Sequence, residues 1–163
     1  PFLTSNSPKI TKIAFIALCK LEENYAYEYA IQHLNTEYSS LRKSIIEFLT
    51  KRPTKEVLEN ACEIFKNGNY DLKKSMISLF FLIGGYKTIP DLMIGTLDNN
   101  ENIRNLSRQY VEVWKVKAIN FFIQPKIEDL EYARNVFNSS YAMHENLKYF
   151  ASNPLEGMDF FLK

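Results

Sequence analysis

Apolar residues recur along this chain at the three- and four-residue spacing of a helix face. In residues 10–23 they fall at positions 10, 13, 14, 17, 18 and 21, which predicts an amphipathic helix. Similar spacing continues through the chain, and the alternation typical of strands is weak throughout. The pattern therefore predicts an all-α protein.

A second regularity has a longer period. Equivalent apolar residues recur at one constant interval, at Ile10, Leu41, Leu72 and Ile103. A fixed period of roughly 30 residues is typical of stacked helical hairpins. We therefore expect about four hairpins, with first helices at residues 10–23, 39–52, 70–84 and 101–117 and second helices at 25–36, 55–66, 88–98 and 126–137.

The next register position carries Thr11, Arg42, Lys73 and Arg104. Two interpretations of its basic residues are open. They are either a ladder that binds a partner, or internal ties that reach an acidic group in the preceding turn, as Asp98 would serve Arg104. We expect the second, and exposed pairs of this kind each contribute less than about 1 kcal/mol.

The period is lost after Trp114. The motif Ile89-Pro90-Asp91-Leu92 returns as Ile127-Glu128-Asp129-Leu130, which is later in the chain than the constant interval requires. We infer an insertion around residues 118–125. The expected organisation is a lead-in at residues 1–8, repeats at residues 9–137 and a C-terminal helical cap at residues 138–163. The aromatic end of the cap either folds back or docks on a segment outside this sequence, and we expect the first.

The stretch from residue 83 to residue 104 resembles a HEAT repeat, of the short variety named after phycobilisome lyases. Its residues are Ile83-Gly84-Gly85, Ile89-Pro90-Asp91-Leu92, Leu97-Asp98 and Ile103-Arg104. The resemblance covers about residues 9–137 and implies a right-handed α-solenoid with its second helices on the concave side. It implies protein binding and scaffolding. A few relatives attach bilin pigments, and a distant group excises alkylated bases from DNA.

Charge is divided unevenly between the two sets of predicted helices. The first helices carry twelve Lys or Arg and six Asp or Glu, whereas the second helices carry four and nine. The net charge of the whole chain is only +1, which argues against a protein that binds nucleic acid through its overall charge. If the second helices are concave, the groove is acidic.

Helix spacing leaves one row of the second helices outside the apolar stripes. These candidate partner-binding residues are Glu28, Tyr29, Gln32, His33, Glu56, Glu59, Asn60, Glu63, Asp91 and Asp129. They form either a solvated helix face or a groove for a basic peptide or protein surface, with Tyr29 as an anchor. We expect no deep pocket around them and a partly solvated His33.

Catalytic signals are weak. The chain has no Gly-rich phosphate loop, no HExxH, no GxSxG and no Cys/His cluster. We expect Cys19 and Cys62 to be buried and reduced, and we expect neither a cofactor nor a metal site. The leading hypothesis is a non-enzymatic scaffold or regulatory module that binds a partner protein. Contact of the basic convex helices with an anionic surface or nucleic acid is second, and an enzyme such as a lyase is third.

The chain begins at Pro1 instead of Met and shows no signal peptide. We therefore expect a fragment or processed product of a larger protein, located in the cytoplasm. Its longest apolar run, residues 76–85, is too short to span a bilayer.

Overall fold

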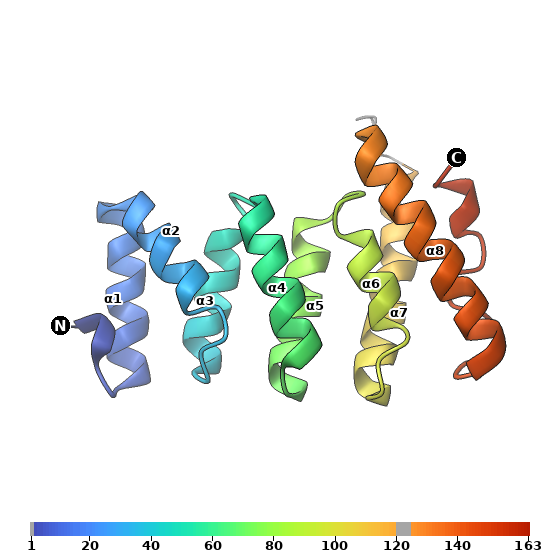
Figure 1. Ribbon diagram of the computed structural model, residues 1–163. Coiled ribbons are helices and arrows are strands. Elements are labelled where there is room, and N and C mark those ends of the chain that lie inside the picture. The colour runs from blue at the N-terminus through green and yellow to red at the C-terminus, as the bar shows by residue number, and fades with distance from the viewer. Residues whose placement is uncertain (1, 120–124) are drawn as a thin grey trace. The chain divides into compact units, whose positions relative to one another are not determined.

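The computed structural model describes residues 2–119 and 125–163. These residues are all-α, and no strand occurs among them (Figure 1). No helix in the described ranges has the length and apolar character needed to cross a membrane. In chain order the elements are η1 (Phe2–Thr4), α1 (Pro8–Leu21), α2 (Glu23–Gln32), α3 (Ser39–Leu49), α4 (Lys55–Asn67), α5 (Tyr70–Ile83), α6 (Ile89–Gly95), α7 (Glu101–Ala118), α8 (Ile127–Leu147) and η2 (Met158–Phe160).

The chain divides into two compact units, residues 1–79 and residues 80–163, called unit 1 and unit 2 below. Most of the insertion expected around residues 118–125 falls on residues 120–124, which lie outside the described residues.

The first helices of the predicted hairpins begin at the same constant interval that the sequence shows. The helices α1, α3, α5 and α7 begin at residues 8, 39, 70 and 101. Each of the four apolar register residues is consequently the third residue of its helix. The expected equivalence of Ile10, Leu41, Leu72 and Ile103 is confirmed in this respect.

The residue directly after each apolar register residue donates an equivalent hydrogen bond in three repeats. Thr11 Oγ1 donates to the carbonyl of Ser5 at 2.9 Å, Arg42 Nη1 donates to that of Thr36, and Arg104 Nη1 donates to that of Asp98 at 2.9 Å. The acceptor lies six positions upstream in each case. The side chains therefore reach the preceding turn as expected. They bind its backbone carbonyl instead of a carboxylate, because these carbonyls have no partner in a regular helix ladder.

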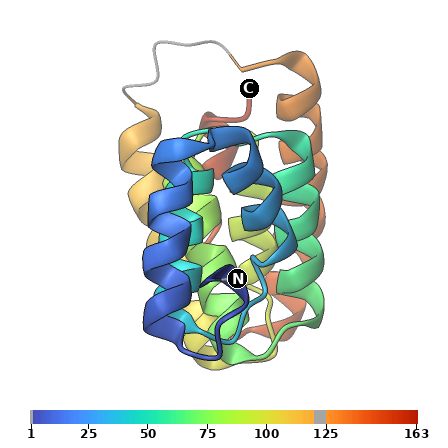
Figure 2. The same ribbon diagram turned by 90° about the vertical axis from the view of Figure 1, so that its left-hand side faces the viewer.

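Unit 1 has two layers, with α1 and α3 in one and α2 and α4 in the other (Figures 1 and 2). The helix α1 contacts both α2 and α3. Phe15 lies between them, with its ring centroid 5.7 Å from that of Tyr29 and 5.8 Å from that of Phe48. The apolar spacing predicted for the first two hairpins therefore closes around an aromatic core.

Unit 2 starts at the end of α5, which the sequence places at Gly84-Gly85. Both glycines have positive φ, 69° and 71°, a conformation that favours glycine and ends the helix. Trp114 of α7 donates its Nε1–H to the carbonyl of Gly85 at 3.2 Å. The short helix α6 contacts both α7 and α8. These contacts hold the Gly-Gly turn and α6 against the longer helices.

The last helix is longer than its pattern suggested. The sequence pattern ends the last repeat at residue 137 and begins the helical cap at residue 138, but α8 continues through this boundary to Leu147. No Gly or Pro interrupts residues 127–147, so nothing in the backbone forces a break. Residues 138–147, which were expected to belong to a separate cap, are therefore part of α8.

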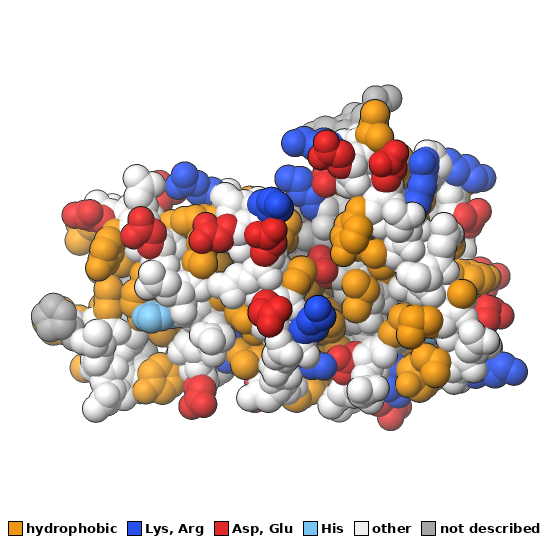
Figure 3. All heavy atoms as spheres, in the orientation of Figure 1, with side chains coloured by type: hydrophobic (Ala, Val, Ile, Leu, Met, Phe, Trp, Pro, Cys, Tyr) orange, Lys and Arg blue, Asp and Glu red, His pale blue; other side chains and the backbone are white. Residues whose placement is uncertain are grey.

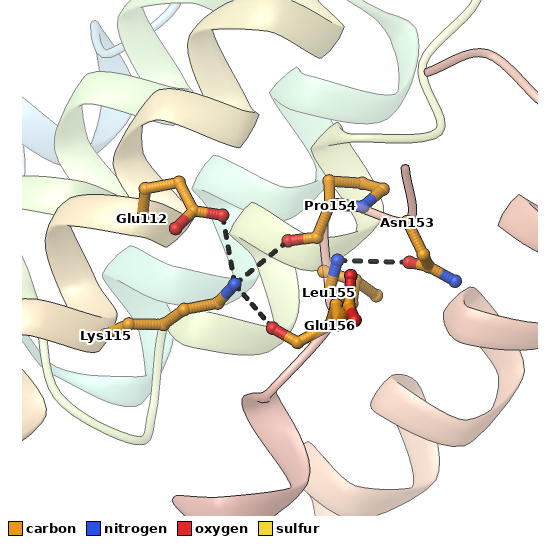
Figure 4. A network of polar contacts seen from close by, with 6 residues as sticks. All are labelled: Glu112, Lys115, Asn153, Pro154, Leu155 and Glu156. Carbon is orange, nitrogen blue, oxygen red and sulfur yellow. Dashed lines mark hydrogen bonds and ion pairs between the residues drawn. The ribbon is translucent and has the colours of Figure 1, made fainter. Parts of the chain in front are cut away.

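The segment after α8 folds back onto α7. Lys115 Nζ contacts the Glu112 carboxylate at 3.0 Å and donates to the carbonyls of Pro154 at 3.3 Å and Glu156 at 2.8 Å (Figure 4). The Tyr86 hydroxyl donates to the carbonyl of Phe161 at 3.1 Å. These contacts agree with the expected fold-back of the aromatic end.

Candidate functional site

The strongest candidate site in unit 1 is the outward side of α2 and α4. The helix α4 begins at its N-cap Thr54, whose side chain accepts a hydrogen bond from the Val57 amide. Its buried residues lie four apart at Val57, Ala61 and Phe65. This spacing turns residues 59 and 63 to the opposite side of the helix.

Four carboxylates and one amide are exposed on this side of α2 and α4. Figure 3 shows acidic side chains distributed over both helices. We call them the acidic face: Glu28, Gln32, Glu56, Glu59 and Glu63.

Asn60 is half-buried and holds the two helices together. Its Nδ2 donates to the backbone carbonyl of Ile31 in α2 at 2.8 Å. The Tyr27 hydroxyl and the Thr54 hydroxyl form a second hydrogen bond between the same two parts of unit 1. The acidic face is therefore built on two helices tied to each other, and Asn60 contributes to its frame.

Two carboxylates of α4 contact partners within their own helix. Glu59 pairs with Lys55 at 3.3 Å, one turn away on the surface. Glu63 accepts from Asn67 Nδ2 at 2.6 Å. An exposed pair such as Lys55–Glu59 contributes little to stability, so these side chains can turn to a partner at small cost.

Tyr29 and His33 lie next to each other and beside the N-terminal segment. Tyr29 is half-buried, its ring lies 4.1 Å from that of His33, and its hydroxyl donates to the Leu3 carbonyl at 3.3 Å. Burial raises the pKa of the Tyr29 hydroxyl. Tyr29 therefore joins α2 to the N-terminal segment and packs against the ring of Phe15.

An open cavity of about 330 Å³ adjoins these two rings. The N-terminal segment from Leu3 to Asn6 lines it together with Tyr29 and His33. Glu28 and Glu63 do not line it. This cavity therefore does not bring the four side chains together, and His33 is half-exposed as expected.

Asp91 was expected on the exposed row and is in fact buried, with 9% of its surface exposed. It lies in α6, where every residue except Ile94 is buried. The reason is that α6 is covered by both α7 and α8, so helix periodicity cannot identify a solvent side. Asp129 is half-buried in α8. Both aspartates belong to unit 2, and the acidic face described here is confined to unit 1.

His144 is a polar core residue that the sequence pattern did not single out. It lies in α8 and is 4% exposed. Its Nε2 is 2.7 Å from Thr96 Oγ1, whose own hydrogen is donated to the Met93 carbonyl. His144 must therefore donate from Nε2. The sequence did contain a signal for this burial, because His144 is spaced to lie on the same face of α8 as the buried Ala133 and Ser140.

The other ring nitrogen of His144, Nδ1, is buried and has no hydrogen-bond partner among the described residues. Protonation would create a second N–H donor there without an acceptor. Burial accordingly lowers the pKa of His144, and the charge of Glu145 opposes this effect. The neutral ring is the form that fits this site.

We expect the free energy of unfolding to fall as pH decreases below about 6.5, the ordinary pKa of histidine. The pKa of His144 is lower in the folded chain than in the unfolded chain, so the unfolded chain takes up the proton first. The loss of stability therefore grows as the pH decreases toward the pKa of the folded chain. One proton limits the slope to about 1.4 kcal/mol per pH unit. Urea unfolding between pH 5 and pH 8 measures it.

His144→Gln keeps an Nε2–H donor for Thr96 and should flatten this dependence. His33→Gln is the matched control and should retain the dependence of the native chain. An unchanged slope in His144→Gln would contradict the assignment.

Neither Cys19 nor Cys62 forms a disulfide, and both are half-buried. Burial raises the pKa of the Cys19 thiol. Across the described ranges, no group of three or more His, Cys, Asp or Glu side chains is arranged to hold a metal ion.

Comparison with known proteins adds no family assignment. No family model matches the chain, and no curated protein matches it. The site must therefore be interpreted from its own geometry and charge.

Proposed function

We propose that this chain is a protein-binding module built from HEAT-like hairpins, which stack as a right-handed solenoid with a C-terminal cap. Two observations support this architecture: the constant interval between the starts of the first helices and the repeated hydrogen bond from the second register position to the preceding turn. Repeat proteins of this kind use extended surfaces for binding.

The acidic face of unit 1 is the proposed binding surface, and its ligand is a basic segment of another protein. The observation that carries this proposal is the exposure of Glu28, Glu56, Glu59 and Glu63 on two adjoining helices. Like charges on neighbouring helices repel each other, and a basic partner would relieve that repulsion while gaining speed and specificity of association.

Binding is favoured over catalysis by the distribution of these groups. A catalytic site needs acid, base or nucleophile converging on one reacting atom. The carboxylates of the acidic face are instead exposed on two helices, and the cavity beside Tyr29 and His33 is lined by neither Glu28 nor Glu63. We propose no cofactor for this function.

Reversing two charges tests the proposal. Glu59→Lys with Glu63→Lys should weaken binding of a fluorescein-labelled Lys/Arg-rich peptide by about tenfold or more and reduce the salt dependence of its affinity, because two attractive charges become repulsive. Fluorescence anisotropy at low and at moderate salt measures both effects.

Glu47→Lys is the matched control, since Glu47 is exposed on α3 outside the acidic face. It should change the affinity much less. Equal binding by the doubly reversed variant, with its fold intact by circular dichroism, would overturn the proposal.

A further inference from the structure

A second cavity lies within unit 2, where the chain leaves α8. Its volume is about 320 Å³, and it is lined by His144, Glu145 and Lys148 at the C-terminal end of α8 and by residues 150–154 of the following segment. One water occupies roughly 30 Å³, and pockets that bind small molecules begin at about 300 Å³. The cavity therefore has the size of a site for a small molecule.

Hydrogen bonds hold the walls of this cavity in place. Asn153 Nδ2 donates to the Tyr141 carbonyl at 3.2 Å and to Glu145 Oε1 at 3.1 Å, and both acceptors belong to α8. On the other side, Lys115 of α7 donates to the carbonyl of Pro154 at 3.3 Å (Figure 4). The segment after α8 is thus tied to both helices, and these ties fix the shape of the cavity.

His144 brings an unsatisfied acceptor to this cavity. It is 4% exposed, and its Nε2–H donates to Thr96 Oγ1, so the neutral ring has a lone pair at Nδ1. Nδ1 has no hydrogen-bond partner among the described residues, and a buried acceptor without a donor is unfavourable. Because His144 lines the cavity, a molecule held there can supply the missing N–H donor.

Two opposite charges border the same cavity. Glu145 and Lys148 are both exposed, and no ion pair joins them among the residues that the structure describes. Lys148 is also the only residue other than glycine with positive φ in the described ranges, at 50°. This conformation favours glycine, and other residues held in it cluster at ligand sites. The cavity thus offers an anionic acceptor, a cationic donor and a neutral acceptor.

We propose that this cavity binds a small zwitterion, an α-amino acid. The ammonium group of the ligand donates to the Glu145 carboxylate and to His144 Nδ1, and its carboxylate accepts from the Lys148 ammonium group. Phe150, whose ring centroid lies 5.9 Å from that of His144, provides an apolar wall. A ligand with only one charge would pair with only one of the two charged side chains. This proposal concerns unit 2 alone and does not depend on the function proposed for the acidic face.

Isothermal titration calorimetry of the whole chain with each of the common L-α-amino acids tests the proposal. At least one should bind with a dissociation constant of about 1 mM or below. Its N-acetyl derivative lacks the positive charge and its amide lacks the negative charge, so each should bind at least about tenfold more weakly. No binding by any amino acid, or equal binding of either derivative, would overturn the proposal.

Lys148→Gly separates binding from folding. Glycine adopts positive φ without strain, so this variant should unfold at the same temperature as the native chain or higher, yet bind the amino acid at least about tenfold more weakly. Glu145→Gln should weaken binding to a similar extent while it keeps an oxygen for Asn153. Glu131→Gln is the matched control, because Glu131 is exposed on α8 outside the cavity, and it should bind as the native chain does. Unchanged affinity in Lys148→Gly or Glu145→Gln would contradict the proposal.

Nuclear magnetic resonance tests the role of His144 directly. Long-range proton–nitrogen correlation spectra distinguish the two ring nitrogens of a histidine, whose signals depend on the hydrogen bonds that each nitrogen makes. The Nδ1 signal of His144 should shift when the amino acid saturates the chain, whereas the ring signals of His33, which does not line this cavity, should stay in place. An unmoved Nδ1 signal of His144 at saturation would overturn the assignment of the ligand to this cavity.

Discussion

Replacement of Phe15 by alanine is expected to lower the free energy of unfolding by about 3–5 kcal/mol. Phe15 is 1% exposed and lies at the centre of the aromatic core of unit 1, against Tyr29 and Phe48. Removal of the ring forfeits its transfer from water and leaves a cavity that the two helix layers can fill only in part. Urea unfolding followed by circular dichroism measures the change.

Ile16→Ala is the matched control in the same helix. Ile16 is 41% exposed, so its truncation should cost about 1 kcal/mol or less. Similar losses for the two variants would show that α1 packs with a different side inward.

Replacement of Arg42 by alanine is expected to cost about 3 kcal/mol. Arg42 is 4% exposed, donates from Nε to Ser75 Oγ at 2.9 Å and donates from Nη1 to the carbonyl of Thr36. Burial lowers the pKa of its guanidinium group, an effect that the charge of Asp71 partly offsets. Alanine would leave both acceptors without their donor and would remove the buried alkyl stem. Urea unfolding is again the measurement.

Lys43→Ala is the control for Arg42, since the neighbouring side chain is exposed, and it should change stability by less than about 0.5 kcal/mol. Arg42→Lys should recover only part of the loss, because an ammonium cannot reproduce the planar fork of the guanidinium. A loss below about 1 kcal/mol in Arg42→Ala would contradict the internal tie.

Arg42 also shows how far the sequence could lead. The repeat register assigned Arg42 and Arg104 to equivalent positions and predicted that each contacts the turn before its own helix. The structure shows this contact for both residues. Which atom would accept the hydrogen bond was not predictable. A carboxylate can be found in the sequence, whereas an unpaired turn carbonyl depends on how each helix ends and the next begins.

The candidate site was predictable in unit 1 and less so elsewhere. Glu59 and Glu63 are exposed because they lie opposite an unambiguous apolar stripe. Asp91 lies in a short helix covered by two neighbours, so its spacing carried no information about exposure. Tyr29 was predicted outside the stripe of α2, and contacts with the N-terminal segment and Phe15 leave it half-buried.

Local sequence was sufficient to predict that the chain is helical, where its first helices begin, and that they recur at a constant interval. These properties are encoded by apolar spacing, turn residues and the repetition of both. Tertiary packing, in contrast, decided which helix faces are covered. The face of α1 that carries three isoleucines is exposed while the face with Thr11 is buried, and His144 is buried against Thr96. Periodicity defines the faces of a helix, but the number and position of its neighbours decide which of those faces meet solvent.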